Sequence, residues 1–211
     1  MFRAQKKLGN FAEFTGIRIA PMPYSIFRRR SQLPYFLEVI ASLVARTLYR
    51  VRSSGAENFP VSGGVLLIAN HVAYVDVLLV GVLSRRPVRF LSWEGFEHQK
   101  VMRFLTRTMG TIPVAETKAK DAIQKSADAL KAGEVVCIFP EGSLTRNGGI
   151  LPLRKGFELI ARRGEAPVVP LAIDGMWGSL FSFSGGKFFW KMPKHFPRPV
   201  TMVVGRPFAA A

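Results

Sequence analysis

Residues 65–69 read Val-Leu-Leu-Ile-Ala, and this run of apolar side chains decides the fold. Gly63 and Gly64 come directly before the run, and Asn70 and His71 come directly after it. A short apolar run between turn-forming residues is typical of a strand that is buried on both faces, as the strands of parallel sheets are. We therefore expect residues 65–69 to form a strand inside such a sheet.

Short apolar runs of the same kind alternate with helix-like stretches along the rest of the chain. Further strands are expected at residues 49–53, 88–92, 111–114, 135–139, 168–173 and 200–204. Helices are expected at residues 74–83, 96–108, 118–131 and 156–162. Strands that alternate with helices predict an α/β domain with a mostly parallel central sheet flanked by helices.

The chain is strongly basic. Its 211 residues include 30 Lys and Arg against 14 Asp and Glu, a formal net charge of +16. The length is typical of one domain, and a hydrophobic content of 48% excludes a wholly disordered basic tail. The charge predicts a polyanionic partner, either an anionic membrane surface or a nucleic acid. Because the sequence contains no nucleic-acid-binding motif, we expect the membrane surface and no nucleic acid.

Cysteine and histidine are scarce. Cys137 is the single cysteine, which excludes an intramolecular disulfide and favours a reducing, cytosol-facing location. It falls in an expected buried strand, so we interpret it as a small core residue. Three histidines leave little material for a histidine-based metal cluster. We predict neither a metal ion nor a cofactor.

Residues 1–49 are predicted to be a basic, amphipathic segment that associates with membranes, ahead of a catalytic domain at residues 50–211. The longest apolar stretch, residues 33–49, contains Glu38 and Arg46. As a helix it would be about 25 Å long, shorter than the ~30 Å hydrocarbon core of a bilayer. We expect an interfacial helix with the preceding arginines on anionic lipid; a helix packed on the domain is the open alternative.

Residues 176–199 combine aromatic side chains with lysines. This composition suits a membrane interface, where rings lie at headgroup depth and ammonium groups meet phosphates. It also suits single-stranded nucleic acid, or a loop whose rings fold back on the core. The aromatic residues concerned are Trp177, Phe181, Phe183, Phe188, Phe189 and Trp190.

Chemistry is suggested by the turn that follows the first strand, residues 70–76, which read Asn-His-Val-Ala-Tyr-Val-Asp. His71 and Asp76 are five positions apart, a separation that a tight turn can close. A neutral imidazole can take a proton from an alcohol, and a carboxylate on its other nitrogen fixes the tautomer and stabilises the imidazolium. No serine or cysteine accompanies the pair in sequence. The pair therefore predicts activation of a substrate hydroxyl.

A second turn leaves the strand expected at residues 135–139 and reads Phe-Pro-Glu-Gly-Ser-Leu-Thr-Arg-Asn-Gly at residues 139–148. In open α/β sheets, ligands gather at the carboxyl ends of strands, so this turn can share one crevice with His71. Backbone N–H groups of the turn and Arg146 offer contacts to an anion. A buried, unpaired Glu141 would be costly, which favours a functional role over a solvated loop.

These residues resemble a known family. Asn70-His71 followed by Asp76 looks like the N-H-x4-D signature of glycerolipid acyltransferases, the family that contains 1-acylglycerol-3-phosphate acyltransferase and other lysophospholipid acyltransferases. Residues 139–143 match the F-P-E-G-[ST] block of that family. Residues 110–114 resemble its G-x-I-x-V block and residues 168–171 its V-P-[VI]-type block. The four blocks occur in the family's order.

The resemblance implies transfer of a fatty acyl group from acyl-CoA or acyl-carrier protein to the free hydroxyl of a lysophospholipid. By this likeness His71 would be the general base and Asp76 its orienting partner. The implied substrate-binding residues are Glu141, Gly142, Ser143 and Arg146 for the glycerol-phosphate part, and Pro113 for the acceptor or acyl pocket. The expected location is peripheral, on the cytoplasmic face of a bacterial inner membrane.

One departure bears on the acceptor. Family members that form phosphatidate usually end the G-x-I-x-V block with an arginine, whereas residues 115–118 here are Ala-Glu-Thr-Lys. Lys118 could substitute as a point charge without the bidentate geometry of arginine. Residues 146–148, 174–179 and 189–191 look more like the acyltransferase module of bifunctional bacterial proteins. In those proteins the module is joined to an acyl-acyl-carrier-protein synthetase or a transporter and acylates lysophosphatidylethanolamine.

We therefore expect lysophosphatidylethanolamine as acceptor, with 1-acylglycerol-3-phosphate as the alternative. A non-enzymatic protein that binds anionic lipid or nucleic acid is the alternative of another class.

Overall fold

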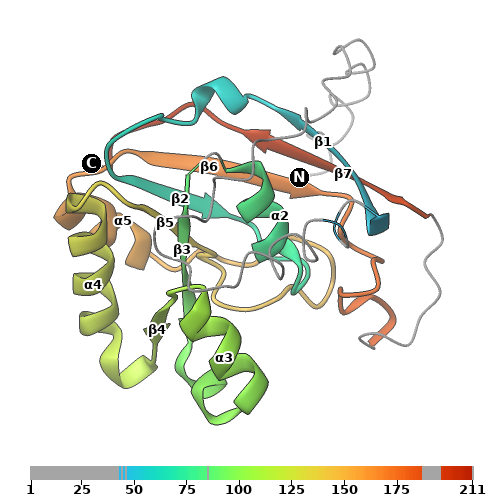
Figure 1. The fold of residues 1–211 in the computed structure, drawn as a ribbon, viewed down its shortest axis with the longest axis horizontal. Coiled ribbons are helices and arrows are strands. Elements are labelled where there is room, and N and C mark those ends of the chain that lie inside the picture. The colour runs from blue at the N-terminus through green and yellow to red at the C-terminus, as the bar shows by residue number, and fades with distance from the viewer. Residues whose placement is uncertain (1–42, 44, 46, 85, 187–195, 211) are drawn as a thin grey trace.

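The structure is a computed structural model that describes residues 43, 45, 47–84, 86–186 and 196–210. Its centre is a seven-stranded sheet with the strand order β1-β7-β6-β2-β5-β3-β4 (Figure 1). All neighbouring strands are parallel except β6 and β7, which are antiparallel. The predicted fold class, a mostly parallel α/β sheet, is confirmed.

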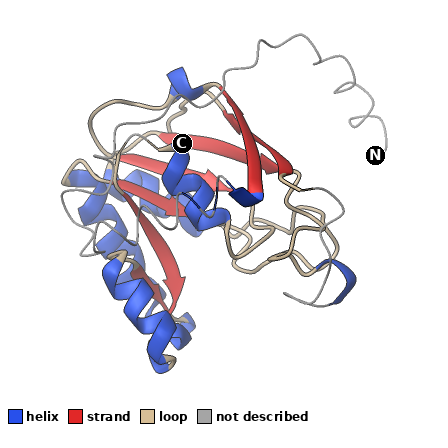
Figure 2. Cartoon of the chain, turned by 45° about the vertical axis from the view of Figure 1, so that its right-hand side comes forward, coloured by secondary structure: helices blue, strands red, loops and turns tan. Residues whose placement is uncertain are grey.

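Every strand expected from the sequence is present, with ends that differ by two residues or fewer. The strands are β1 (Tyr49–Ser54), β2 (Val65–Ala69), β3 (Val88–Trp93), β4 (Ile112–Val114), β5 (Val135–Ile138), β6 (Val168–Asp174) and β7 (Arg198–Val204). The run at residues 65–69 is the middle strand of the sheet, with β5 on one side and β6 on the other. Long loops follow the central strands and gather at one end of the sheet (Figure 2).

Successive side chains of the central strands enter two separate cores, one on each face of the sheet. On β2, Val65, Leu67 and Ala69 pack in the first core, whereas Leu66 packs in the second. β5 divides in the same way, with Cys137 in the first core and Val136 in the second. Alternation by two positions follows from the pleat of a strand, and burial on both faces explains why these runs are continuously apolar.

The two cores are closed by different helices. α2 (Asp76–Leu83) covers the first core with Leu79 and Val80, whereas α4 (Ala119–Lys131) and α5 (Gly156–Gly164) cover the second with Leu130 and Ile160. The α4 sequence has apolar residues at helical spacing on one face, as predicted, and that face is buried.

The helix expected at residues 96–108 is divided in two. A short 3-10 helix, Glu94–His98, comes first and α3 (Lys100–Thr108) follows it. Gln99 separates them with an extended backbone, φ −100° and ψ 117°. The helix expected at residues 74–83 begins instead at Asp76, because the carboxylate of Asp76 accepts the N–H groups of the preceding turn.

The predictions for the N-terminal segment and the aromatic stretch concern the described residues only in part. Of residues 33–49, the described ones before β1 are helical, and residues 1–42 lie outside the described part, so the domain boundary stays a prediction. Within the residues that the structure describes, no helix is long and apolar enough to cross a bilayer. In the aromatic stretch, Trp177 and Phe181 pack against the first core, which agrees with the alternative of a loop whose rings fold back on the core. Phe188, Phe189 and Trp190 lie outside the described residues.

Gly64 is required where the end of α4 meets the start of β2. A Cβ atom at this position would lie 2.1 Å from the carbonyl oxygen of Leu130, and a backbone atom cannot move aside as the end of a side chain can.

We expect Gly64→Ala to lower the free energy of unfolding by about 1–3 kcal/mol, the usual cost of overpacking, measured by urea denaturation. Gly156→Ala is the matched control, because a Cβ atom there meets nothing within 4 Å at the first residue of α5. The control should be neutral or slightly stabilising; equal losses for both variants would contradict the steric argument.

Candidate active site

The two turns singled out in the sequence leave neighbouring strands. β2 and β5 are parallel and paired from Val65 with Val135 to Ile68 with Ile138. Their carboxyl ends therefore lie side by side, and the turns at residues 70–76 and 139–148 begin at the same edge. The backbone N–H of Thr145 donates to the carbonyl of His71 over 3.0 Å, which joins the two turns directly. The two turns therefore lie next to each other at one edge of the sheet, as predicted.

His71 and Asp76 are in contact, as their spacing predicted. Nδ1 of His71 lies 3.1 Å from Oδ2 of Asp76. Because an ionised carboxylate can only accept, a neutral imidazole in this position has its proton on Nδ1 and its lone pair on Nε2. The imidazole also stacks on the ring of Phe139, with the ring centres 4.0 Å apart. With 17% of its side chain exposed, His71 can reach a substrate.

Asp76 is fully buried and holds the turn in shape. Its Oδ2 accepts the backbone N–H groups of Val72 at 2.7 Å and Ala73 at 2.8 Å in addition to the imidazole. Asp76 is also the first residue of α2, where the partial positive charge of the helix N-terminus favours an anion. One carboxylate oxygen thus starts the helix, closes the turn and orients the imidazole.

Glu141 is buried as well, and both of its carboxylate oxygens accept backbone N–H groups. Oε1 accepts from His71 at 2.8 Å and Oε2 accepts from Leu151 at 2.7 Å. The carboxylate therefore connects the histidine turn to the loop that returns from the second turn. This arrangement points to a positioning role for Glu141, since its oxygens already have donors without a substrate.

Asn70 fixes the histidine turn from the other side. Its Oδ1 accepts the N–H of Ile173 at 2.7 Å, and its Nδ2 donates to the carbonyl of the same residue at 2.9 Å. The amide side chain thereby continues the pairing of β2 with β6 beyond Ala69, where the backbone of the turn departs. An aspartate or a leucine could not make both bonds.

Gly142, Ser143 and Arg146 are exposed beside this centre, where a substrate can meet them. Gly142 has φ 72°, a left-handed conformation that glycine adopts without strain. The guanidinium of Arg146 lies over the ring of Phe183, 3.9 Å from its centre. The stacked ring orients the arginine beside the catalytic turns.

Arg154 is a candidate that sequence reasoning missed. Its backbone N–H donates to the carbonyl of Pro140 over 2.8 Å, and its guanidinium lies so close to Gly142 that a Cβ atom there would be 2.7 Å from Nε. Arg154 and Arg146 are thus two exposed cations beside one turn. The only sign of Arg154 in the sequence was the basic pair Arg154-Lys155 before an expected helix. The proximity of Arg154 to Gly142 depends on the tertiary fold.

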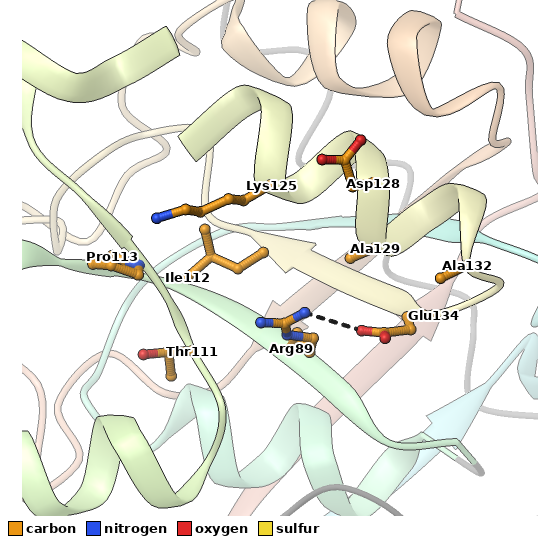
Figure 3. A pocket seen from close by; sticks show the side chains of 9 residues that line it. All are labelled: Arg89, Thr111, Ile112, Pro113, Lys125, Asp128, Ala129, Ala132 and Glu134. Carbon is orange, nitrogen blue, oxygen red and sulfur yellow. Dashed lines mark hydrogen bonds and ion pairs between the residues drawn. The ribbon is translucent and has the colours of Figure 1, made fainter. Parts of the chain in front are cut away.

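Pro113 lies away from this centre. It is on β4, at the edge of the sheet, and β5 and β3 separate β4 from β2, about 14 Å at the usual spacing of strands. There it lines a groove of about 490 Å³ that His71 does not line. Figure 3 shows Arg89 paired with Glu134 in this groove, with Lys125 and Asp128 of α4 beside them.

Lys118 follows the carboxyl end of β4 and already has an anionic partner. Its Nζ lies 2.8 Å from Oε1 of Glu94, and the hydrogen bond to that carboxylate raises the pKa of the ammonium group. The positive charge that sequence analysis assigned to a substrate phosphate is therefore shared with an acidic side chain.

The surroundings of three other residues indicate structural rather than catalytic roles. Asp174 ends β6 and accepts the N–H of Gly175 at 2.7 Å, a bond that stabilises the turn after the strand. Cys137 is buried in β5, where desolvation raises the pKa of its thiol, so a core role is supported. Burial likewise raises the pKa of Tyr49 to about 12. Among the described residues, no three His, Cys, Asp or Glu side chains gather as metal ligands would.

Comparison with known proteins identifies the class. A family model described as Acyltransferase matches residues 50–174, more than half of the chain and all of the elements that carry this centre. The 1-acyl-sn-glycerol-3-phosphate acyltransferase of Bacillus subtilis (strain 168) is 30% identical over 163 residues, which are 76% of this chain and 75% of the relative. The chain belongs to the glycerolipid acyltransferase family and is an acyltransferase. Its substrates are, in general terms, an acyl donor and a lysophospholipid acceptor.

Other relatives are longer than this chain. The human 1-acyl-sn-glycerol-3-phosphate acyltransferase alpha is 31% identical over 59% of this chain and 46% of its own length. The chloroplastic relative from Brassica napus is 27% identical over 70% of this chain and 44% of its own length. The crystal structure of the 1-acyl-sn-glycerophosphate (LPA) acyltransferase from Thermotoga maritima superposes with a TM-score of 0.59 at 22% identity, covering 83% of this chain and 69% of that one. That likeness confirms the fold.

We expect Glu141→Gln to reduce both activity and stability. A glutamine side chain has one accepting oxygen, so its NH2 group would face either the N–H of His71 or that of Leu151. A buried donor without an acceptor costs about 1–3 kcal/mol. The free energy of unfolding should fall by that amount, and kcat should fall with it because the histidine turn loses an anchor.

Glu158→Gln on α5 is the control, because this carboxylate is exposed in the first turn of the helix. If Glu141→Gln unfolds at the same urea concentration as the unaltered protein, the anchoring role of Glu141 is wrong.

Proposed function

We propose that the protein transfers a fatty acyl group from a thioester to the free hydroxyl of 1-acylglycerol-3-phosphate, with His71 as general base. The observation that carries this proposal is the hydrogen bond between Nδ1 of His71 and buried Asp76. It leaves Nε2 as proton acceptor at a site that substrates can reach. The function of the curated relatives, as their names describe it, supports the same reaction.

The reaction follows from the side chains. Nε2 of His71 takes the hydroxyl proton of the acceptor as the oxygen attacks the carbonyl carbon of the thioester. Asp76 stabilises the imidazolium that forms. The carbon–sulfur bond then breaks, the ester remains on the glycerol, and the departing thiolate receives the proton from Nε2. The donor is acyl-CoA or acyl-carrier protein, which carry the same thioester.

The acceptor assignment differs from the one expected from the sequence. The absent arginine after the G-x-I-x-V block favoured lysophosphatidylethanolamine, but the relatives named above favour 1-acylglycerol-3-phosphate. Arg146 and Arg154 support this acceptor, because two guanidinium groups beside one turn suit a terminal phosphate dianion.

Lysophosphatidylethanolamine is the second candidate, and one observation favours it. Lys118, the cation nearest in sequence to the absent arginine, is paired with Glu94. A zwitterionic headgroup needs less positive charge around it than a phosphate dianion does. We further propose that the enzyme works at the cytoplasmic face of a membrane as a peripheral protein, which the formal charge of +16 supports.

His71→Ala should abolish transfer, and Asp76→Asn should lower kcat about 10³–10⁴-fold. An asparagine oxygen in the place of Oδ2 can still accept from Val72, Ala73 and the imidazole, but it carries no negative charge to stabilise the imidazolium. Its NH2 group would be buried in the place of Oδ1, where no described residue accepts a hydrogen bond. The measurement is diacyl product from labelled palmitoyl-CoA with circular dichroism as the folding control. Turnover by folded His71→Ala at the unaltered rate would overturn the mechanism.

Arg154→Gln should raise KM for 1-acylglycerol-3-phosphate about tenfold or more, because one charge-assisted hydrogen bond to phosphate contributes about 1.5–3 kcal/mol. KM for lysophosphatidylethanolamine should change less. A panel of both lysolipids, assayed with the same acyl donor, measures the two effects.

Arg162→Gln in the last turn of α5 is the control for loss of one positive charge. Transfer to lysophosphatidylethanolamine alone, with no turnover of 1-acylglycerol-3-phosphate by the unaltered protein, would decide for the second candidate.

A further inference from the structure

Helix α3 presents apolar side chains to the outside and buries two threonines. Val101, Phe104 and Leu105 are 71%, 53% and 37% exposed, whereas Thr106 and Thr108 are buried. Positions 101, 104 and 105 lie on one face of a helix. A helix that packs on a core normally turns such a face inward, so this face is built to meet something other than the described part of the chain.

A basic flank runs along the same helix. Lys100, Arg103 and Arg107 are exposed beside the apolar face. Arg107 pairs with Glu97 over 3.2 Å, whereas neither Lys100 nor Arg103 pairs with a carboxylate in the described part of the chain. An apolar face with a basic edge is the pattern of helices that lie in the interface of a bilayer.

Trp93 is a second exposed apolar group, at the catalytic edge and seven residues before the start of α3. It is the last residue of β3, its side chain is 64% exposed, and its ring meets Phe96 edge to face with the ring centres 5.6 Å apart. The carboxyl end of β3 is on the same edge of the parallel sheet as the carboxyl ends of β2 and β5. Figure 1 shows α3 at an end of the molecule, beside β4.

We propose that Trp93 and the outer face of α3 dock the enzyme on a bilayer that contains anionic lipid. The three apolar side chains of α3 enter the acyl region, the indole lies at headgroup depth, and Lys100 and Arg103 meet lipid phosphates. The net charge of +16 makes a negatively charged surface the complementary partner. Docking by this surface turns the catalytic edge toward the layer in which a lysophospholipid resides.

This inference does not depend on which acceptor the enzyme uses. The surface consists of other residues than the N-terminal segment and residues 176–199, the two segments expected from the sequence to meet a membrane.

Vesicle flotation tests the surface directly. The full chain is mixed with vesicles of phosphatidylcholine alone or with phosphatidylglycerol added. We expect binding to the anionic vesicles, a loss of about tenfold or more for the double variant Phe104→Ser, Leu105→Ser, and a loss of about fivefold for Arg103→Gln that disappears at high salt.

The matched control is Val61→Ser with Phe208→Ser. These residues are also exposed, but Val61 precedes β2 and Phe208 pairs with Val168 at the start of β6, so both lie at the opposite edge of the sheet. The control should bind as the unaltered chain does. Equal losses in both double variants, or none in the α3 variant, would overturn the proposal.

Tryptophan fluorescence distinguishes a bilayer from the chain's own residues as the occupant of this surface. In a variant with Trp177→Phe and Trp190→Phe, Trp93 should be quenched by iodide in solution and protected once anionic vesicles are added. Brominated lipid should then quench it. Protection from iodide before vesicles are added would mean that the chain itself covers the surface, and the proposal would be wrong.

Activity separates this inference from the catalytic one. The α3 variant should keep the unaltered rate with a short-chain acceptor dissolved as monomers, and should lose rate with an acceptor held in anionic vesicles. A rate lowered equally in both assays would overturn docking as the role of α3. If the unaltered chain were inactive in both assays, the proposed reaction would be wrong. Vesicle flotation would still test docking in that case.

Discussion

The carboxylate of Asp76 is the point on which the catalytic edge depends. One oxygen, in a residue with no exposed surface, receives the imidazole and two backbone N–H groups. It therefore determines where β2 stops, how sharply the chain turns and where α2 begins. Glu141 then ties this turn to the next one through its two oxygens, and Asn70 ties it to β6. Both oxygens of buried Glu141 have a donor, and Oδ2 of Asp76 has three, which offsets the cost of burying the two carboxylates. Oδ1 of Asp76 has no hydrogen-bond partner among the described residues. The site is consequently a rigid frame of backbone amides around a single imidazole.

Much of the fold could be predicted because the strands are short runs buried on both faces. Such runs are continuously apolar and end at glycine, proline or polar turns, so their limits are visible in the sequence. The order of the strands was not visible. That Tyr49 pairs with Arg198 and that β4 is an edge strand depends on packing between distant segments. For the same reason Pro113, grouped with the site by motif, lies on the edge strand beside α4.

The reacting pair could be predicted because its spacing is local. Five positions between His71 and Asp76 are closed by one turn, and the turn chemistry needs no distant partner. The surroundings of the site were less visible. Arg154 approaches Gly142 only because the loop after the second turn folds back, and Lys118 meets Glu94 across two strands that are adjacent only in the folded sheet. The aromatic rings of Trp177 and Phe181 pack inward, although their composition fitted a membrane surface equally well.

The pairing of β1 with β7 has a consequence for how the protein is made. β1 is the first described strand of the sheet in sequence and β7 the last, yet they are neighbours along the whole length of β1, and no other described strand lies beside β1. During synthesis from the N-terminus, β1 must wait without its neighbour until β7 has left the ribosome, while β2, β3 and β5 can already assemble. Contacts between such distant segments close late and slowly. Until β7 is available, β1 is an exposed strand edge that can pair with another chain. We therefore expect misassembly to begin at β1, although this strand is remote from the catalytic residues.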